Sequence, residues 1–330
     1  MHIGTIGTGF IVDRALTHIQ HVKDAHIEAI YSRSEEKAKE FAYKFNVGKT
    51  YTNMDAMFAD EDIDTIYVAS PNSLHYPYAL KALKAHKNVI CEKPFVSTVR
   101  ELDELIEEAK KQHVFLWEAI TNIYTPNLNI VGEHLKDVGD IKLVVCNFSQ
   151  YSSRYQAYKD GQNPNVFNPA FSGGAIMDIN VYNIHFCMYL FGKPRSYVYL
   201  PNIAENGIDT SGVLLMHYDG FMCVCIGCKD SSSEYFATIQ GDKGTIKVDG
   251  GSTGQCINVS LTTINSQTDQ PVQNIGVKQV PHMAYEFQAF ESMIQKQDYK
   301  TCYELLDYSR DVLTIIETAR KQAGVYFDAD

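Results

Sequence analysis

The chain of 330 residues lacks several features that would mark a nucleic-acid, membrane or secreted protein. It has no basic run, and 29 Lys and Arg against 40 Asp and Glu give a net charge of −11, which disfavours nucleic acid or an anionic membrane as a partner. No apolar stretch approaches the roughly 18 residues of a membrane helix. The N-terminus does not read as a signal peptide, and there is no internal repeat or low-complexity linker. We therefore expect a globular, cytoplasmic protein.

The eight cysteines do not have the spacing of a zinc site. Most stand among apolar residues, as expected of reduced, buried thiols. Cys223, Cys225 and Cys228 are close in sequence, but their segment is typical of a strand in which alternation puts Cys223 and Cys225 on one face. We predict no metal and interpret these cysteines as small apolar residues of a strand.

Strand and helix patterns alternate over the first 120 residues. Apolar segments such as HIGTIG, HIEAIYS, DTIYVAS and NVICEKP alternate with amphipathic ones such as SEEKAKEFAYKF and VRELDELIEEAKKQ. DTIYVAS is nearly all apolar, the pattern of a sheet covered on both faces. The order predicts an α/β Rossmann domain with a doubly wound parallel sheet over residues 1–121.

The pattern changes after about residue 122. Closely spaced strand segments follow, among them IKLVVCNFSQY, SYVYLP, GVLLMHY, FMCVCIGC, YFATIQG and GTIKVDG, which favours an antiparallel sheet. A helix is expected at INVYNIHFCMYLFG and two more in the last fifty residues. Residues 122–330 are predicted to form an α+β domain with one large, mostly antiparallel, open-faced sheet, and the C-terminal helix is a candidate to pack back on the first domain. Because apolar sheet faces seek cover, we expect a homodimer or homotetramer through this sheet.

A glycine-rich turn, GTG at residues 7–9, stands where the first strand meets the first helix. The dinucleotide fingerprint requires glycine at the tight turn and where the backbone meets the pyrophosphate, and Gly7 and Gly9 satisfy both. Val12 departs from the Gly or Ala of the third position. A simple turn between strand and helix is the alternative. The candidate cofactor-binding residues here are Gly7, Gly9, Phe10 and Ile11.

The end of the second strand bears on the choice between NAD and NADP. An acidic residue there binds the ribose of NAD, whereas a nearby Arg accommodates the phosphate of NADP. The chain reads AIYSRS, without a carboxylate, and Ser32 and Arg33 offer a hydroxyl and a guanidinium to a 2′-phosphate. A helix cap and a surface arginine are the alternative. We predict that NADP(H) is favoured over NAD(H).

Two further strand ends are expected at the ligand crevice. The fourth strand is followed by Ser70, Pro71 and Asn72, which we predict to flank the cofactor, and by His75 at the start of a helix, a further candidate for cofactor binding whose role we expect to be structural rather than catalytic. The fifth strand ends at Glu92 and Lys93 in the segment CEKPF, and both are candidate cofactor-binding residues. The Lys93 ammonium could hydrogen-bond a substrate hydroxyl and the cofactor ribose, and it could stabilise a developing alkoxide. An exposed loop lysine is the alternative.

A second chemical cluster lies in SGGAIMDINVYNIH. Asp178 and Tyr182 are four residues apart and share a helical face, and His185 lies three residues further on the same side. Together they make a possible proton-transfer set. A free tyrosine has a pKa near 10, which suits neutral pH poorly, but an adjacent cation such as Lys93 would lower that pKa. A half-buried amphipathic helix is the alternative.

These motifs together resemble the family of glucose–fructose oxidoreductase, inositol dehydrogenase and rhizopine catabolism proteins (Gfo/Idh/MocA). The resemblance covers nearly the whole chain, through GTGFI, SRS, ASPNSLHYPYALKALKAHKNVICEKPF, SGGAIMDINVY, ATIQGDKGTIKV and the terminal helices, with CEKP the most specific segment. It implies a Rossmann domain, an open-faced sheet and hydride exchange between a nicotinamide and a sugar, polyol, diol or related alcohol.

The resemblance also implies roles for individual residues. Lys93 matches the family's active-site lysine. Tyr182 matches the tyrosine that is the proposed acid–base group in the glucose–fructose oxidoreductase and dihydrodiol dehydrogenase branch. Inositol-type members of the family often carry His at this position. Asp178 matches an aspartate that orients the substrate, and His185 has no firm counterpart. Ile123 stands where the dihydrodiol branch tends to carry Arg, which weakens any transfer of that branch's specificity.

The leading hypothesis is therefore an NAD(P)-dependent dehydrogenase or reductase acting on the CH–OH group of a small molecule. A non-enzymatic sensor could keep the fold and bind dinucleotide, because fold alone does not establish catalysis. The presence of both Lys93 and Tyr182 favours the enzyme. A hydrolase or isomerase that uses the cofactor transiently is a third possibility.

Overall fold

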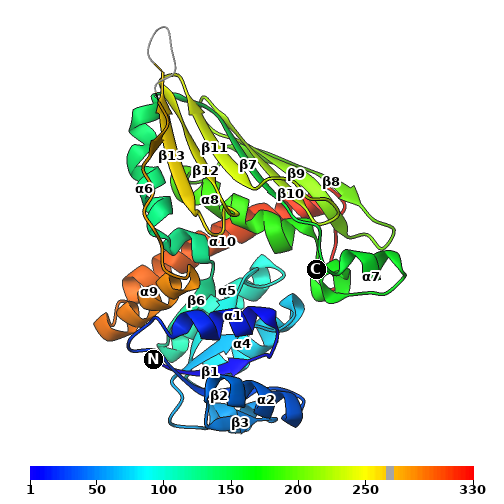
Figure 1. Ribbon diagram of the computed structural model, residues 1–330. Coiled ribbons are helices and arrows are strands. Elements are labelled where there is room, and N and C mark those ends of the chain that lie inside the picture. The colour runs from blue at the N-terminus through cyan, green and yellow to red at the C-terminus, as the bar shows by residue number, and fades with distance from the viewer. Residues whose placement is uncertain (265–270) are drawn as a thin grey trace. The chain divides into compact units, whose positions relative to one another are not determined.

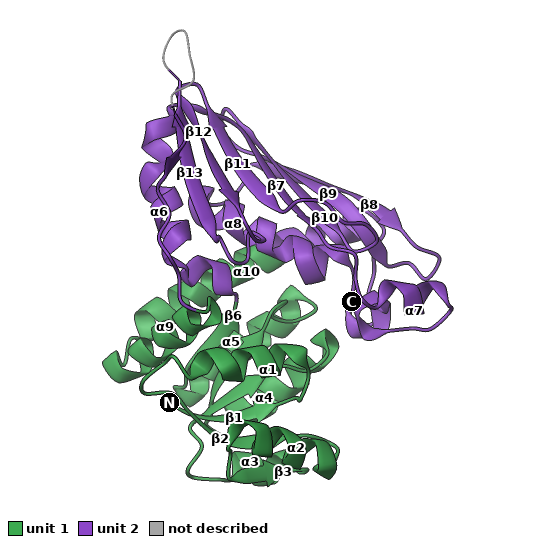
Figure 2. Cartoon of the chain, in the orientation of Figure 1, with its two compact units in different colours: residues 1–119, 281–313 green, residues 120–280, 314–330 purple. Residues whose placement is uncertain are grey.

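The computed structural model describes residues 1–264 and 271–330 and divides the chain into two compact units. Unit 1 comprises Met1–Ala119 and Pro281–Leu313, and unit 2 comprises Ile120–Val280 and Thr314–Asp330 (Figure 2). Each unit has its own sheet. Late segments of the chain therefore contribute to both units.

The sheet of unit 1 is parallel, with six strands in the order β3-β2-β1-β4-β5-β6. The strands are β1 (His2–Ile6), β2 (His26–Tyr31), β3 (Lys49–Tyr51), β4 (Thr65–Val68), β5 (Asn88–Glu92) and β6 (Leu116–Ala119). β4 is buried along its whole length, as a strand covered on both faces must be. The predicted doubly wound parallel sheet is confirmed. The strand order reverses between β1 and β4, which places the ligand crevice at their carboxyl ends.

Helices connect and cover these strands (Figure 1). They are α1 (Phe10–Ile19), α2 (Glu35–Phe45), α3 (Met54–Phe58), η1 (Asn72–Leu74), α4 (His75–Lys84) and α5 (Val99–Gln112). Several begin at side-chain caps that satisfy their first N–H groups. Ser34 caps α2, Asn53 caps α3, and Thr98 caps α5 in a reciprocal capping box with Glu101.

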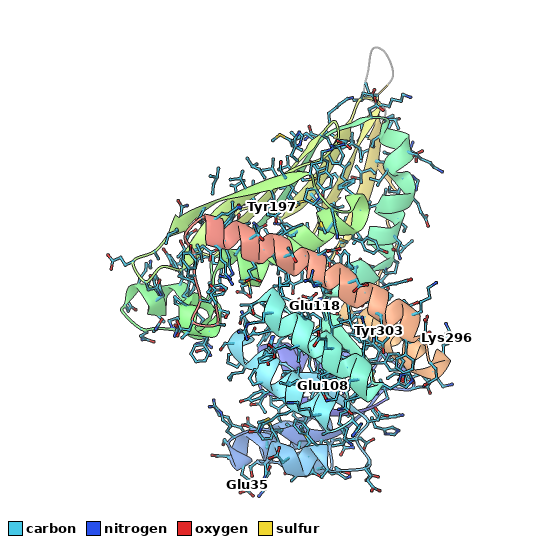
Figure 3. The ribbon with its side chains drawn as sticks, turned by 180° about the vertical axis from the view of Figure 1, so that it is seen from behind. Glu35, Glu108, Glu118, Tyr197, Lys296 and Tyr303 are labelled. Atoms are coloured by element: carbon cyan, nitrogen blue, oxygen red, sulfur yellow. The ribbon has the colours of Figure 1, made fainter. Side chains whose placement is uncertain are left out.

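Two late helices complete the core of unit 1. α9 (Met283–Lys296) packs beside α1, and its Phe287 and Phe290 contact the rings of Tyr67 and Trp117 at 5.6 and 4.9 Å between centroids. α10 (Tyr299–Gln322) begins in unit 1 and ends in unit 2. α5 lies beside the first half of α10 (Figure 3). Lys110 Nζ on α5 is 5.1 Å from the ring centroid of Tyr303 on α10.

The sheet of unit 2 has eight strands in the order β14-β13-β12-β11-β7-β10-β9-β8. They are β7 (Ile141–Ser149), β8 (Ser196–Ile203), β9 (Asp209–His217), β10 (Met222–Cys228), β11 (Phe236–Gly241), β12 (Gly244–Asp249), β13 (Asn258–Thr263) and β14 (Gln273–Asn274). Among the described strands the pair β7–β10 is parallel and the other neighbours are antiparallel, so the predicted mostly antiparallel sheet is confirmed.

The helical segments of unit 2 include a long helix on one face of this sheet. They are η2 (Thr121–Tyr124), α6 (Pro126–His134), η3 (Leu135–Val138), α7 (Tyr155–Lys159), η4 (Asn165–Phe167), η5 (Pro169–Phe171), the π-helical turn η6 (Ile176–Asn180) and α8 (Val181–Phe191). α8 runs along β7 and β10 (Figure 1), and α6 contacts β13. The sequence patterns did not indicate α6, α7, β13 or β14.

The strand alternation predicted for the cysteine segment is confirmed. Cys223 and Cys225 are buried on the face that carries α8, whereas Cys228 is partly exposed. The Sγ atom of Cys187 from α8 lies 3.7 Å from that of Cys225 and 3.9 Å from that of Cys146. These thiols fill the space between helix and sheet. In the described part of the chain, no three His, Cys, Asp or Glu side chains gather in a way that could hold a metal.

Candidate active site

The turn between β1 and α1 has the backbone geometry that a dinucleotide requires. Gly7 has a φ of +126°, and a Cβ there would lie 2.5 Å from the carbonyl oxygen of Ala69, so glycine is needed for the turn itself. Around Gly9 no described atom lies within 4 Å of the place a Cβ would take. No described side chain caps α1, so its first N–H groups can bind phosphate. The turn fits a pyrophosphate.

A pocket of about 360 Å³ opens at the carboxyl ends of β1, β2 and β4, a size that suits part of a small cofactor. Half of the predicted cofactor-binding residues line it: Gly7, Gly9, Ser32, Arg33, Ser70 and Pro71. Eight residues that the sequence analysis did not predict for the cofactor site also line it: Ile6, Thr8, Tyr31, Ser34, Lys37, Ala69, Leu74 and Tyr78. Lys37 lies in the first turn of α2, and its position three residues after the SRS segment was an available signal.

The wall of this pocket beside α2 is polar and cationic. Ser32 Oγ accepts a hydrogen bond from Ser34 N at 3.2 Å, and Ser34 Oγ accepts one from Lys37 N at 3.3 Å. Each hydroxyl hydrogen can therefore donate to an anion. Arg33 and Lys37 are exposed, and the described lining contains no carboxylate. This donor set fits a phosphate at the position where an NAD-specific site would place an acid.

The described lining of the pocket does not include the other predicted cofactor residues, Phe10, Ile11, Asn72, His75, Glu92 and Lys93. Phe10 is 75% exposed, with the Arg14 guanidinium 4.6 Å from its ring centroid. Asn72 opens η1 and is half-buried. Their contact with a cofactor stays a prediction.

The imidazole of His75 hydrogen-bonds to the backbone that follows β4 and to the backbone that follows β5. Its side chain is buried, with Nε2 2.9 Å from the carbonyl oxygen of Ser70 and Nδ1 3.0 Å from that of Pro94. Burial lowers the pKa of His75, while hydrogen bonds to these backbone carbonyls act in the opposite direction. His75 therefore holds two backbone segments at the crevice in place.

Two buried glutamates fix the backbone around Lys93. Glu92 Oε1 accepts a hydrogen bond from the Tyr67 hydroxyl at 2.5 Å, and its Oε2 accepts one from Lys93 N at 3.2 Å. Burial raises the pKa of Glu92, and the Tyr67 hydrogen bond opposes that rise. From β6, Glu118 Oε1 accepts from Phe95 N at 3.2 Å. The half-buried Lys93 side chain thus leaves β5 from a backbone that is held on both sides.

In unit 2 the structure brings Asp178 and Tyr182 onto consecutive turns. Asp178 lies in η6 and Tyr182 in the first turn of α8, and both are half-buried. The Tyr182 ring lies 5.8 Å from that of Phe148. It also packs against Gly254, where a Cβ would come within 2.8 Å of the ring. His185 differs from these two because it is buried.

The glycine pair before this helix is explained by close packing. A Cβ on Gly173 would lie 2.7 Å from the backbone of Val166. Gly174 has a φ of +105°, and a Cβ there would overlap the carboxylate of Asp209. Asp209 is fully buried and accepts hydrogen bonds from Ile176 N at 2.7 Å and from the Tyr199 hydroxyl at 2.6 Å. The start of the helix is therefore fixed by a buried carboxylate.

Lys229, which the sequence analysis did not single out, forms an ion pair with Asp178. The distance between Lys229 Nζ and Asp178 Oδ2 is 2.6 Å. The lysine is buried, and the aspartate side chain is 31% exposed. Its sequence position, directly after the cysteine-containing strand, gave no signal because most lysines are exposed.

Comparison with known proteins assigns this architecture to a family. The family model described as "Oxidoreductase family, NAD-binding Rossmann fold" matches residues 1–120, and the "GFO/IDH/MocA C-terminal domain" matches residues 135–247. The scyllo-inositol 2-dehydrogenase (NADP(+)) IolU of Bacillus subtilis is 35% identical over 326 residues, which are 98% of each chain. The chain belongs to the Gfo/Idh/MocA oxidoreductase family. It is an NAD(P)-dependent oxidoreductase, and the resemblance seen in its sequence is confirmed.

Two other known proteins are also similar to the chain. The trans-1,2-dihydrobenzene-1,2-diol dehydrogenase of Xenopus tropicalis is 32% identical over 250 residues, which are 74% of this chain and 72% of that protein. The 3-ketoreductase KijD10 of Actinomadura kijaniata, in complex with NADP and TDP-benzene, is 20% identical and matches 99% of both chains with a TM-score of 0.85. This last likeness is one of fold. No helix in the described residues is long and apolar enough to cross a membrane.

Proposed function

We propose that the protein is an NADP(H)-preferring dehydrogenase or reductase of a sugar, cyclic polyol, diol or related small alcohol. The observation that carries the cofactor preference is the polar, cationic wall formed by Ser32, Arg33, Ser34 and Lys37 in the unit 1 pocket. The substrate class is supported by two relatives whose names denote a cyclic polyol and a ring diol.

The cofactor preference is tested by removing the cations of that wall. A hydrogen bond to a charged group contributes about 1.5–3 kcal/mol, so Arg33→Ala should weaken NADPH binding by about 10- to 100-fold. NADH binding should change little, because NADH lacks the 2′-phosphate. Lys37→Ala should act in the same direction. Lys39→Ala, on the same helix but paired with Glu35 at 2.6 Å, is the matched control. Equal losses for NADH and NADPH in a fluorescence titration would contradict the preference.

In the proposed reaction, bound NADP(H) supplies the exchange of hydride with the substrate carbon. Tyr182 passes a proton to or from the substrate oxygen. Lys93 hydrogen-bonds the same oxygen and favours the phenolate form of Tyr182. Asp178 accepts a hydrogen bond from a neighbouring hydroxyl of the substrate and orients the ring. The pairing of Lys93 with Tyr182 is part of the proposal.

Substitution of the two groups separates this mechanism from cofactor binding alone. Lys93→Met and Tyr182→Phe should each lower turnover by about 10²- to 10⁴-fold, the usual contribution of a positioned acid or base. NADPH binding should persist in Tyr182→Phe. Tyr189→Phe is the control, because Tyr189 lies on the same helix and donates to Asn129 Oδ1 at 2.8 Å. Turnover near the wild-type value in both active-site variants would rule out the proposed pair.

The same measurements distinguish an enzyme from a sensor. Wild-type protein is assayed for NADP⁺ reduction with cyclic polyols, sugars and diols, and for NADPH oxidation with the corresponding ketones. Turnover with at least one of them is expected. Binding of NADPH without turnover across the whole panel would favour a sensor of the same fold.

We further propose that the open face of the unit 2 sheet is the interface of a homodimer or homotetramer. Strand pairing places Leu200, Val213 and Ile226 in one row of this face. The next row holds Val198, Leu215, Val224 and Val145. Leu200 is 59% and Val198 47% exposed. A contiguous apolar face of this kind is typical of an interaction surface.

The interface is tested by placing a charge on it. Leu200→Asp should shift the molar mass in light scattering toward the monomer. Tyr43→Asp, at a 91% exposed position on α2, should leave the mass unchanged. A monomeric wild-type protein at micromolar concentration would contradict the proposal.

The cytoplasm is the proposed compartment because all eight cysteines are free, including Cys187 and Cys225 with sulfurs 3.7 Å apart.

A further inference from the structure

Lys229 is a buried cation beside the helix that carries Asp178 and Tyr182. Only 2% of its side chain is exposed, and its Nζ lies 2.6 Å from Asp178 Oδ2. The same ammonium donates to the carbonyl oxygen of Val166 at 2.9 Å and lies 4.6 Å from the centroid of the Phe167 ring. A carboxylate, a carbonyl and an aromatic ring therefore replace water around the charge.

The strand before Lys229 also holds the backbone of this helical segment. Asn180 and Asn183 donate through Nδ2 to backbone carbonyls of β10 at 3.0 and 2.9 Å. Gly227 allows the close approach, because a Cβ there would lie 2.7 Å from the Cβ of Asn180. The two asparagines fix the helix on β10, and Lys229, two residues beyond Gly227, fixes the side chain of Asp178.

The stability of unit 2 alone gives little reason for a lysine at this place. Removing an ammonium and a carboxylate from water costs several kcal/mol per ion, and buried ion pairs can often be replaced by apolar residues without loss of stability. The pair here is also asymmetric, because Lys229 is buried while the Asp178 side chain is 31% exposed. The exposed end is the one that solvent, and therefore a substrate, can reach.

We propose that Lys229 is a positioning residue that acts through Asp178. It holds the carboxylate in one orientation, so that Asp178 offers a fixed acceptor to a substrate hydroxyl beside the reacting carbon. This inference rests on the substrate-orienting role of Asp178 in the proposed function. Lys229 itself does not touch the substrate. Its contribution is therefore specific to substrates with a neighbouring hydroxyl.

The test is a double-variant cycle in the full-length protein, with NADP⁺ and scyllo-inositol as the probe substrate. Lys229→Met, which keeps the length of the side chain without its charge, should lower kcat/KM by about 10²-fold, mainly through a higher KM. The dissociation constant for NADPH should not change. In an Asp178→Asn background the same substitution should cause no further loss, because the group through which it acts is already altered. Lys229→Arg, which keeps the charge, should recover most of the loss.

The controls separate positioning from general damage. Lys321→Met removes a lysine that pairs with Glu317 at 2.6 Å and Asp330 at 3.1 Å in the same unit, and it should leave KM unchanged. If Lys229→Met does not fold, Lys229→Arg and Asp178→Asn still test the proposal, since Lys229→Arg should keep KM close to the wild-type value while Asp178→Asn should raise it, with the dissociation constant for NADPH unchanged in both.

Each contrary outcome points to a different step. Additive losses in the double variant, or an unchanged kcat/KM in Lys229→Met, would overturn the positioning role of Lys229. Wild-type activity in Asp178→Asn would instead overturn the role of Asp178 in the proposed function. Absence of wild-type turnover with scyllo-inositol would overturn the cyclic polyol as substrate, and the inference with it.

Discussion

Replacing the buried Asp209 by asparagine should remove part of the pH dependence of the stability of unit 2. Asp209 lies under the start of the helix that carries Tyr182 and accepts hydrogen bonds from Ile176 N at 2.7 Å and the Tyr199 hydroxyl at 2.6 Å. Burial raises the pKa of Asp209 to about 6, although both hydrogen bonds oppose the rise. The carboxyl group therefore titrates near neutrality in the folded protein.

The sign and the size of the effect follow from linkage. An unfolded aspartate has a pKa of 3.8, so between pH 3.8 and about 6 the folded chain keeps a proton that the unfolded chain has released. The stability that this proton contributes is fully present below pH 3.8 and is lost as the pH rises through 6. The two pKa values differ by about 2 pH units, which corresponds to about 3 kcal/mol.

Calorimetric unfolding of wild-type protein and Asp209→Asn between pH 4 and 7.5 measures this difference. The asparagine imposes a constant offset, because its amide takes the place of one carboxylate oxygen at every pH. After this offset is subtracted, the free energy of unfolding of the variant should rise relative to that of the wild type by about 3 kcal/mol as the pH increases from 4 to 7.5. This corresponds to about 6–12 °C in the melting temperature of unit 2. Asp328→Asn, at an exposed position of the same unit, should run parallel to wild type. Parallel curves for wild type and Asp209→Asn would refute the reasoning.

Three further substitutions test the packing around the site and the sheets. Gly7→Ala should destabilise unit 1 by more than about 2 kcal/mol, because the Cβ would lie 2.5 Å from Ala69 O at a φ of +126°. Gly9→Ala, whose Cβ meets open space, should preserve the melting temperature but weaken NADPH binding. Equal melting temperatures for the two variants would refute this difference between the two glycines. Thr98→Ala should cost about 1 kcal/mol in urea unfolding by breaking the capping box of α5, and an unchanged midpoint would count against the cap. Asn127→Ala should lower the free energy of unfolding by about 3 kcal/mol, because this buried amide donates to three backbone carbonyls at 2.9–3.2 Å and accepts from a backbone N–H at 2.8 Å. A loss below about 1 kcal/mol would show that these backbone groups find other partners.

The parallel sheet could be predicted from the sequence because most of its strands carry a local signal. β1, β4 and β5 are apolar runs between amphipathic helices, and the chain order alone then implies a doubly wound sheet. β13 and β14 were missed for the opposite reason. NVSLTT has only two apolar residues on its buried face, and a two-residue strand has no periodicity at all. Such strands exist because a neighbour offers hydrogen bonds, which a local pattern does not reveal.

The cofactor turn was accessible to sequence analysis for a similar reason, while other site residues were not. Gly7 and Gly9 are required by backbone geometry within a few residues, so the turn can be recognised from its context. Tyr78 lines the same pocket from α4, but nothing in its sequence neighbourhood indicates that. Lys229 is a stronger case, because its burial depends on Asp178 and Phe167, which come from distant parts of the chain.

The candidate groups of the two units are fixed in the same way. In unit 1, Glu92 and Glu118 accept N–H groups from the backbone next to Lys93, and in unit 2, Asp209 accepts an N–H group at the start of the segment that carries Asp178 and Tyr182. A buried carboxylate is costly unless hydrogen bonds satisfy it, so each one constrains the backbone that supplies its donors. The side chains of Lys93 and Tyr182 can therefore stay half-buried while their main chain is held from the core, as their proposed roles require. Catalysis by positioned groups requires this combination, because a displacement of 1 Å costs about 10²-fold in rate.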